Sequence, residues 1–347
     1  MTVFIGKSGT GKTNFVSAIR FLRDYLVSGP QPFQTQYERC ATNPGGAALF
    51  RVVFDVPGFT ERFTYLLEFH EQFSHPKLES LEYGSKTVFK QTFANGPRWD
   101  VRPALVWVPE PGGVALGGLP GLEEAVIAYT ALTTGIGVYT FPYDVLKATG
   151  QRGGIPGLLD YGQNFLEVIG AIARDLYNIA IRKSISASLR RINETIVSVE
   201  LDSVQNPQKA LVGHRFGDKT LTLDLSQESD GFRRYYAHLV ALYQLPPKQT
   251  LIFEEPENGI YPGALSLLSD EFRAAPDAGR GQVLLTTHSP ALLDHFSEEQ
   301  IRIVDLVDLE TRIGPLASEQ KEAIREELLH AGELLTVDPA RIQEPVA

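Results

Sequence analysis

The sequence predicts an α/β protein that combines a parallel sheet with an antiparallel one. In the final third of the chain, strand patterns alternate with helix patterns, as they do in a parallel sheet. From Leu49 to about Phe93, apolar and polar residues alternate with a period of two, which indicates antiparallel strands. A glycine-rich loop at residues 6–13 separates an apolar strand from a helical pattern, and this order is typical of an α/β unit that binds a ligand.

Composition and net charge limit the class of protein that this chain can be. The chain has 347 residues, 43% of them hydrophobic and 21% charged, as expected for one large or two ordinary globular domains. A net charge of −10 argues against a surface that coats nucleic acid nonspecifically, although one local basic patch remains compatible with it. The single cysteine, Cys40, excludes an intrachain disulfide and a multi-cysteine metal site. Since no signal peptide and no run of 18 apolar residues is found, we expect a cytoplasmic protein without a membrane span.

The loop at residues 6–13 reads GKSGTGKT and matches the phosphate-binding pattern G-x-x-x-x-G-K-[ST]. Residues 3–5 predict a buried strand before it, and residues 14–27 predict a helix after it. In this context, glycines let backbone N–H groups surround a β-phosphate, and the helix N-terminus adds a favourable dipole. The alternative is a glycine-rich turn that matches by chance. The predicted nucleotide contacts are Gly6, Ser8, Gly9, Thr10, Gly11, Lys12, Thr13 and Asn14.

Within this loop, two side chains have expected roles of their own. Lys12 would reach the β- and γ-phosphates, and the Thr13 hydroxyl would bind Mg²⁺.

Other patterns predict the remaining elements. We expect strands at 51–56, 62–69, 77–83, 86–93, 195–201 and 220–225, helices at 122–132 and 158–191, and a loop at 109–121. The tail from Glu319 to Gly332 is expected to be one amphipathic helix and a short extension.

Two acids end an apolar strand at residues 251–253. Glu254, at the end of a strand beside the phosphate loop, is expected to hold the Mg²⁺ shell, and Glu255 to orient or deprotonate the attacking water. The alternative is a solvated strand end followed by a proline turn.

A histidine follows the next apolar strand, at residues 283–285. His288 would hydrogen-bond a γ-phosphate, or it is an ordinary loop histidine. The order of the motifs favours the first interpretation, because the phosphate loop, the two acids and His288 each follow a strand. Ligands of open α/β sheets bind at that edge of the sheet.

Residues Ser229, Asp230 and Gly231 precede a predicted helix. They are either a helix N-cap or a second phosphate-binding helix terminus, and the two interpretations are compatible.

Taken together, these motifs resemble those of ABC-type ATPases of the SMC/RecF/OLD-like branch. Residues 6–13 resemble the Walker A motif, 229–231 the signature motif, and 251–257 the Walker B motif. Residues 257–262 are similar to the D-loop and 287–290 to the H-switch; 160–165 and 330–334 resemble two further segments of these proteins.

The resemblance implies the head of an ABC-type ATPase, a P-loop NTPase with a mixed central sheet, an antiparallel β subdomain and a helical lobe. It implies lobe I at 1–110, the helical lobe at 111–220 and lobe II at 221–347. It also implies ATP hydrolysis with Mg²⁺ in a homodimer, where Ser229 and Gly231 contact the nucleotide of the second copy. Glu255, His288 and Lys12 would then be catalytic, and Thr13 and Glu254 would bind the metal.

Three features depart from the family pattern. The residues that form a strand before the Walker A motif in the family, about 25 of them, are not found ahead of Gly6, and Glu254 stands where aspartate is more usual. The Q-loop is not placed by its pattern, and Gln151 and Gln163 are the candidates for its glutamine.

The resemblance leaves the partner open. Too few residues follow His288 for a nuclease domain, so an effector would be a separate chain. Relatives of this shape act in DNA repair or phage defence, and the alternative function is an ATP-bound scaffold that regulates a nuclease or toxin. A transporter subunit is disfavoured by the signature and the antiparallel insertion. A basic cluster could contact DNA, or it is the solvated face of a helix; it comprises Arg174, Arg182, Lys183, Arg190 and Arg191.

Overall fold

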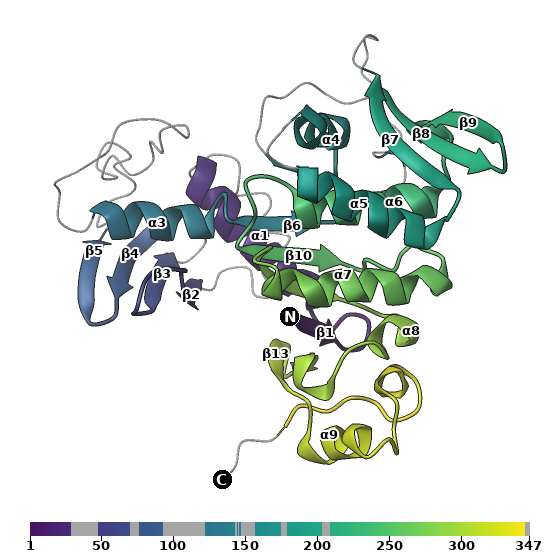
Figure 1. The fold of residues 1–347 in the computed structure, drawn as a ribbon. Coiled ribbons are helices and arrows are strands. Elements are labelled where there is room, and N and C mark those ends of the chain that lie inside the picture. The colour runs from purple at the N-terminus through teal and green to yellow at the C-terminus, as the bar shows by residue number, and fades with distance from the viewer. Residues whose placement is uncertain are drawn as a thin grey trace. The chain divides into compact units, whose positions relative to one another are not determined.

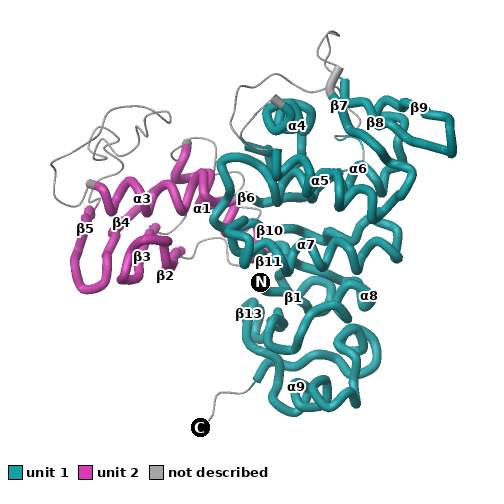
Figure 2. The backbone as a smooth tube through the Cα atoms, in the orientation of Figure 1, with its two compact units in different colours: residues 1–13, 137–347 teal, residues 14–136 magenta. Residues whose placement is uncertain are grey.

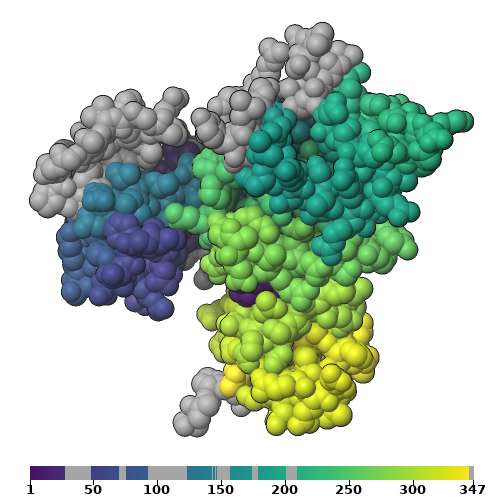
Figure 3. All heavy atoms as spheres, viewed as in Figure 1, coloured from purple at the N-terminus to yellow at the C-terminus, as the bar shows by residue number. Residues whose placement is uncertain are grey.

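The computed structural model describes residues 1–28, 48–69, 76–92, 122–142, 144, 146, 157–174, 179–202 and 209–343, which are coloured by residue number in Figures 1 and 3. Two units account for the chain: unit 1 comprises residues 1–13 and 137–347, and unit 2 comprises residues 14–136 (Figure 2). Within the described ranges, no helix is both long and apolar enough to cross a membrane.

A six-stranded mixed sheet forms the centre of unit 1, in the order β13-β12-β1-β11-β10-β6. Strand β1 pairs in parallel with β11 and β12, β10 pairs in parallel with β11, and β12 and β13 form an antiparallel hairpin. The inner strands are buried on both faces, which is why their sequences are short apolar runs rather than alternating patterns. The strands are β1 (Thr2–Ile5), β6 (Ile136–Tyr139), β10 (Thr250–Glu254), β11 (Gln282–Thr286), β12 (Ile301–Val307) and β13 (Glu310–Pro315).

Helices and a small second sheet complete unit 1. Helix α6 is buried along nearly its whole length, from Phe232 to Leu242, because it packs against α5 and α7. The helices are α4 (Phe165–Arg174), α5 (Ile179–Ile192), α6 (Asp230–Tyr243), α7 (Leu265–Asp277), α8 (Pro290–Leu293) and α9 (Ser318–Arg325), with 3₁₀ turns η6 (Leu225–Gln227), η7 (Pro262–Ala264), η8 (Glu298–Gln300) and η9 (Ala331–Leu335). The antiparallel strands are β7 (Ile196–Asp202), β8 (Lys209–Phe216) and β9 (Lys219–Asp224).

Unit 2 is an antiparallel sheet covered by helices. The order is β2-β3-β4-β5, and its core contains the aromatic side chains of Phe21, Tyr25, Phe63 and Tyr65. Its elements are β2 (Leu49–Phe54), β3 (Phe63–Phe69), β4 (Pro76–Tyr83), β5 (Lys86–Thr92), α3 (Leu122–Leu132) and α1 (Lys12–Ser28), which starts at the end of unit 1.

The mixed α/β fold class is confirmed, and the strands and helices lie close to their predicted positions. One helix prediction was wrong in extent. The pattern at 158–191 contains two helices, and the first begins only at Phe165, since Gly162 takes a positive φ of 75° just before it. The tail contains one helix and an extension, as predicted; the helix ends at Arg325, and Glu327 after it is left-handed, with φ 58°.

Four strands, β6, β8, β12 and β13, were not predicted. Cys40, Gln151 and the loop at 109–121 lie outside the described residues. The division into three lobes stays a prediction.

Candidate functional site

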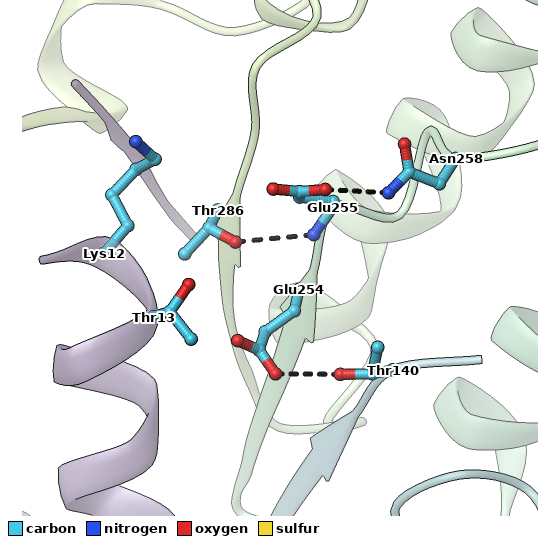
Figure 4. A pocket seen from close by; sticks show the side chains of 7 residues that line it. All are labelled: Lys12, Thr13, Thr140, Glu254, Glu255, Asn258 and Thr286. Carbon is cyan, nitrogen blue, oxygen red and sulfur yellow. Dashed lines mark hydrogen bonds between the residues drawn. The ribbon is translucent and has the colours of Figure 1, made fainter. Parts of the chain in front are cut away.

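The carboxyl ends of β1, β10 and β11 lie at one edge of the central sheet, because these strands are parallel neighbours. The phosphate loop, the two acids and His288 therefore leave the sheet at the same edge, where open α/β sheets bind ligands. A pocket of about 230 Å³ opens there (Figure 4). Its lining residues all belong to unit 1: Lys12, Thr13, Thr140, Glu254, Glu255, Asn258 and Thr286.

The phosphate loop has a backbone that only glycine fits at several points. A Cβ on Gly6 would lie 2.1 Å from the carbonyl oxygen of Val304. Gly9 and Gly11 have positive φ values of 83° and 104°, a region that L side chains avoid. The Lys12 ammonium donates to the carbonyl oxygens of Gly6, at 2.7 Å, and Lys7, at 2.9 Å. The loop is thus a backbone cradle that suits a phosphate.

Lys12 carries a cation that its surroundings disfavour. Its side chain is buried, with 6% exposure, and burial lowers its pKa from the ordinary value, while the negative charge of Glu255 partly opposes this. A phosphate in the pocket would compensate the buried ammonium, so the electrostatics of the site suit an anionic ligand.

Glu254 is oriented by Thr140, which directly follows the neighbouring strand β6. The Thr140 hydroxyl, directly after β6, donates to Glu254 Oε2 at 2.8 Å. The other carboxylate oxygen lies on the side of Thr13 (Figure 4). A hydroxyl and one carboxylate fit Mg²⁺, which takes oxygen ligands and completes its shell with phosphates and water. Within the described ranges, no group of three or more His, Cys, Asp or Glu side chains could hold a metal ion.

Glu255 has a strained backbone and a fixed side chain. Its φ is +45°, which costs a non-glycine residue about 1–3 kcal/mol. The Glu255 N–H donates to the Thr286 carbonyl at 3.0 Å, and Asn258 Nδ2 donates to Glu255 Oε2 at 2.8 Å. His288 Nε2 lies 3.8 Å from Glu255 Oε1. The two polar groups expected beside a γ-phosphate are therefore neighbours.

A third acid, Glu257, holds the peptide of His288. Its Oε1 accepts hydrogen bonds from the Thr287 hydroxyl, at 2.7 Å, and from the His288 N–H, at 2.9 Å. The chain after β10 is thereby tied to the chain after β11.

Ser229 and Gly231 lie at the start of α6 and do not line the pocket that the structure describes. The Ser229 hydroxyl accepts from the Phe232 N–H at 3.2 Å, which confirms the N-cap interpretation. A Cβ on Gly231 would lie 3.0 Å from the Gly259 carbonyl oxygen, so packing against residues 259–261 also favours a small residue here. Arg234 donates to the Asn258 carbonyl and fastens α6 to this segment.

Several predicted site residues are thus brought together, namely Lys12, Thr13, Glu254 and Glu255, with His288 beside them. Their chemical roles stay predictions, as do those of Ser8 and Asn14. Gln163 accepts from the Tyr161 N–H at 3.2 Å within a local turn. Sequence reasoning missed Thr140 and Thr286, and it placed Glu257 and Asn258 in motif-like segments without giving them a role in the site. A polar residue directly after an apolar strand was the available signal for Thr140.

Two arginines of the basic cluster, Arg190 and Arg191, make contacts within the protein. Arg191 pairs with Asp270 at 2.7 Å, and this hydrogen bond holds the pKa of Asp270 below its usual value. Arg190 donates to the Ile196 and Val197 carbonyls, at 3.1 and 2.8 Å. These two side chains therefore have partners within the protein, and contact of the cluster with DNA stays a prediction.

Comparison with known proteins supports an ATPase fold of the SMC-like type. Residues 168–294 match the family model described as "AAA domain, putative AbiEii toxin, Type IV TA system". The chain is similar to the SMC head bound to the C-winged helix domain of ScpA, with a TM-score of 0.55, 11% identity, and coverage of 93% of this chain and 92% of that one. It is also similar to an Smc head domain with an extended coiled coil, bound to the C-terminal domain of ScpA and derived from Pyrococcus furiosus, with a TM-score of 0.52, 12% identity, and coverage of 94% and 93%. A search of curated proteins found no match.

The chain therefore has the fold of an SMC ATPase head, a P-loop NTPase fold with a mostly parallel central sheet. This confirms the resemblance to ABC-type, SMC-like ATPases at the level of the fold.

Proposed function

We propose that this protein binds ATP with Mg²⁺ and hydrolyses it as a homodimer. The observation that carries the proposal is the meeting of Lys12, Thr13, Glu254 and Glu255 in one pocket at the carboxyl edge of the sheet. These residues come from two parts of the chain that are about 240 residues apart, and their chemistry is that of phosphoryl transfer.

Each side chain has a task that its position allows. The loop and Lys12 hold the phosphates, and Thr13 and Glu254 hold Mg²⁺, which neutralises charge on the phosphate oxygens. Glu255, which Asn258 keeps in one orientation, aligns the attacking water and accepts its proton. His288, beside Glu255, donates to the γ-phosphate.

The second copy would supply the signature residues. Ser229 is exposed at the start of a 14-residue helix, whose N-terminus carries a partial positive charge. Since Ser229 is not part of its own chain's pocket lining, we infer that it completes the pocket of the partner subunit.

The Glu255→Gln variant tests this proposal, because the amide keeps the shape of the side chain and removes the base. With saturating ATP and Mg²⁺, light scattering on a sizing column should show a dimer that forms without turnover. The matched control, Lys12→Ala in the same background, should stay monomeric. A Glu255→Gln protein that binds ATP and remains a monomer would remove the basis of the dimer model.

A second candidate function is an ATP-bound scaffold that regulates a separate effector and hydrolyses little ATP. The description of the matched family names a toxin–antitoxin system, and both similar structures hold an SMC head together with a domain of ScpA. These names favour a protein partner. Turnover that is very slow in the isolated protein, with one effector protein recovered on the ATP-bound Glu255→Gln form, would favour the scaffold.

Action on DNA, in genome maintenance or phage defence, needs its own test. Replacing Arg190 or Arg191 by glutamate would break contacts within the protein. Lys183, by contrast, is exposed on α5, so reversing its charge is a cleaner test. An ATP-dependent shift of duplex DNA that Lys183→Glu abolishes would support DNA as the partner. Absence of any shift with ATP would exclude it at that surface.

A further inference from the structure

The β12–β13 hairpin packs directly against the phosphate loop. A Cβ on Gly6 would meet the Val304 carbonyl oxygen, on β12, at 2.1 Å. A Cβ on Gly11 would meet the Thr311 hydroxyl oxygen, on β13, also at 2.1 Å. The first and last glycines of the loop therefore both abut the same hairpin, which follows the loop by about 300 residues.

Thr311 also makes a polar contact with the loop. Its hydroxyl donates to the carbonyl oxygen of Thr10 at 3.1 Å. In a trans peptide, the C=O and the following N–H point in opposite directions. Because the Thr10 carbonyl points toward Thr311, the N–H of Gly11 points away from the hairpin. This N–H is one of the loop donors that would face a phosphate.

The position of Thr311 is set by rigid elements. Strand β12 pairs in parallel with β1, the strand that leads into the loop, so Ile5 faces Ile303. In the hairpin, Thr311 lies opposite Leu306. The strand that presents the loop and the hairpin that carries Thr311 are thus parts of one hydrogen-bonded frame.

We propose that Thr311 is a positioning residue of the nucleotide site: it fixes the Thr10–Gly11 peptide and thereby sets the affinity for the nucleotide phosphates. The inference rests on the proposed ATP-binding function. Threonine suits this role because its hydroxyl holds the carbonyl and its side chain fills the space left by Gly11, where a Cβ would lie 2.1 Å from Thr311 Oγ1 and 2.9 Å from Cγ2.

The test compares Thr311→Val, which keeps the shape and removes the donor, with Thr311→Ser, which keeps the donor. Thr222→Val, at an exposed position of β9, is the matched control. Two measurements are made: amide hydrogen exchange of residues 6–13 without nucleotide, and the Kd for ATP with Mg²⁺.

We expect Thr311→Val to speed exchange in the loop and to weaken ATP binding by about three- to tenfold, the usual net effect of one hydrogen bond. Thr311→Ser should restore most of both, and Thr222→Val should change neither. Unchanged loop exchange in Thr311→Val would overturn the inference, and faster exchange with an unchanged Kd would overturn its link to affinity. If the unaltered protein binds no nucleotide, the proposed function fails and the affinity part fails with it; the exchange data alone then decide whether Thr311 positions the loop.

Discussion

Replacing Thr140 by valine should weaken the response of the site to Mg²⁺. The substitution keeps the shape of the side chain and removes the donor that contacts Glu254 Oε2 at 2.8 Å. A hydrogen bond to a charged group contributes about 1.5–3 kcal/mol, and loss of a group that orients a metal ligand costs about 10- to 100-fold in metal affinity. We expect the loss of orientation to raise the Mg²⁺ concentration that the site needs by about tenfold.

The assay is the Mg²⁺ dependence of binding of a fluorescent ATP analogue, which does not require turnover. Thr220→Val, another exposed threonine of β9, controls for the loss of a strand hydroxyl. Binding without Mg²⁺ should be unchanged in both variants. An unaltered or lower Mg²⁺ requirement in Thr140→Val would show that this hydroxyl does not orient a metal ligand, and that the role assigned to Glu254 needs revision.

Two further predictions concern the stability of the folded protein, and a third concerns the position of His288. Leu309→Gly should raise the free energy of unfolding, measured by chemical denaturation, by about 0.5–1 kcal/mol. Leu309 has φ 66° and is 76% exposed, so glycine relieves the backbone strain with little loss of buried apolar surface. A decrease in the free energy of unfolding would contradict this. Burial lowers the pKa of His238 from 6.5 to about 4. As the pH falls, this histidine is therefore protonated in the unfolded state at a higher pH than in the folded state. Its contribution should lower the free energy of unfolding by about 2 kcal/mol between pH 7 and pH 5. His238→Phe should lack that part of the decrease, and an identical pH profile would refute the assignment. Glu257→Ala should lower kcat with little change in KM for ATP, since the His288 N–H loses its acceptor. Steady-state kinetics test this, with Glu257→Gln as the conservative variant, and a change in KM alone would argue against the prediction.

Local sequence patterns were sufficient for much of the architecture. The strand before the phosphate loop, the helix after it, and the strands ending at Glu254 and Thr286 follow from apolar runs and glycine positions that need only neighbouring residues. The N-cap role of Ser229 is equally local, since its partner is three residues away. Strands β12 and β13 were not predicted. Their hairpin turns through Asp308 and Leu309, both left-handed without a glycine, so the usual turn signal is missing.

By itself, the sequence determined that a phosphate loop, two acids and a histidine each follow a strand, because these motifs are short and their physical requirements are local. Only the tertiary structure decided which distant residues meet them. Thr140 reaches Glu254 across 114 positions and Thr311 reaches Thr10 across 301, through strand pairing that no local pattern specifies. The left-handed backbone of Glu255 is likewise a product of its contacts with Thr286 and Asn258, since glutamate alone does not favour that conformation.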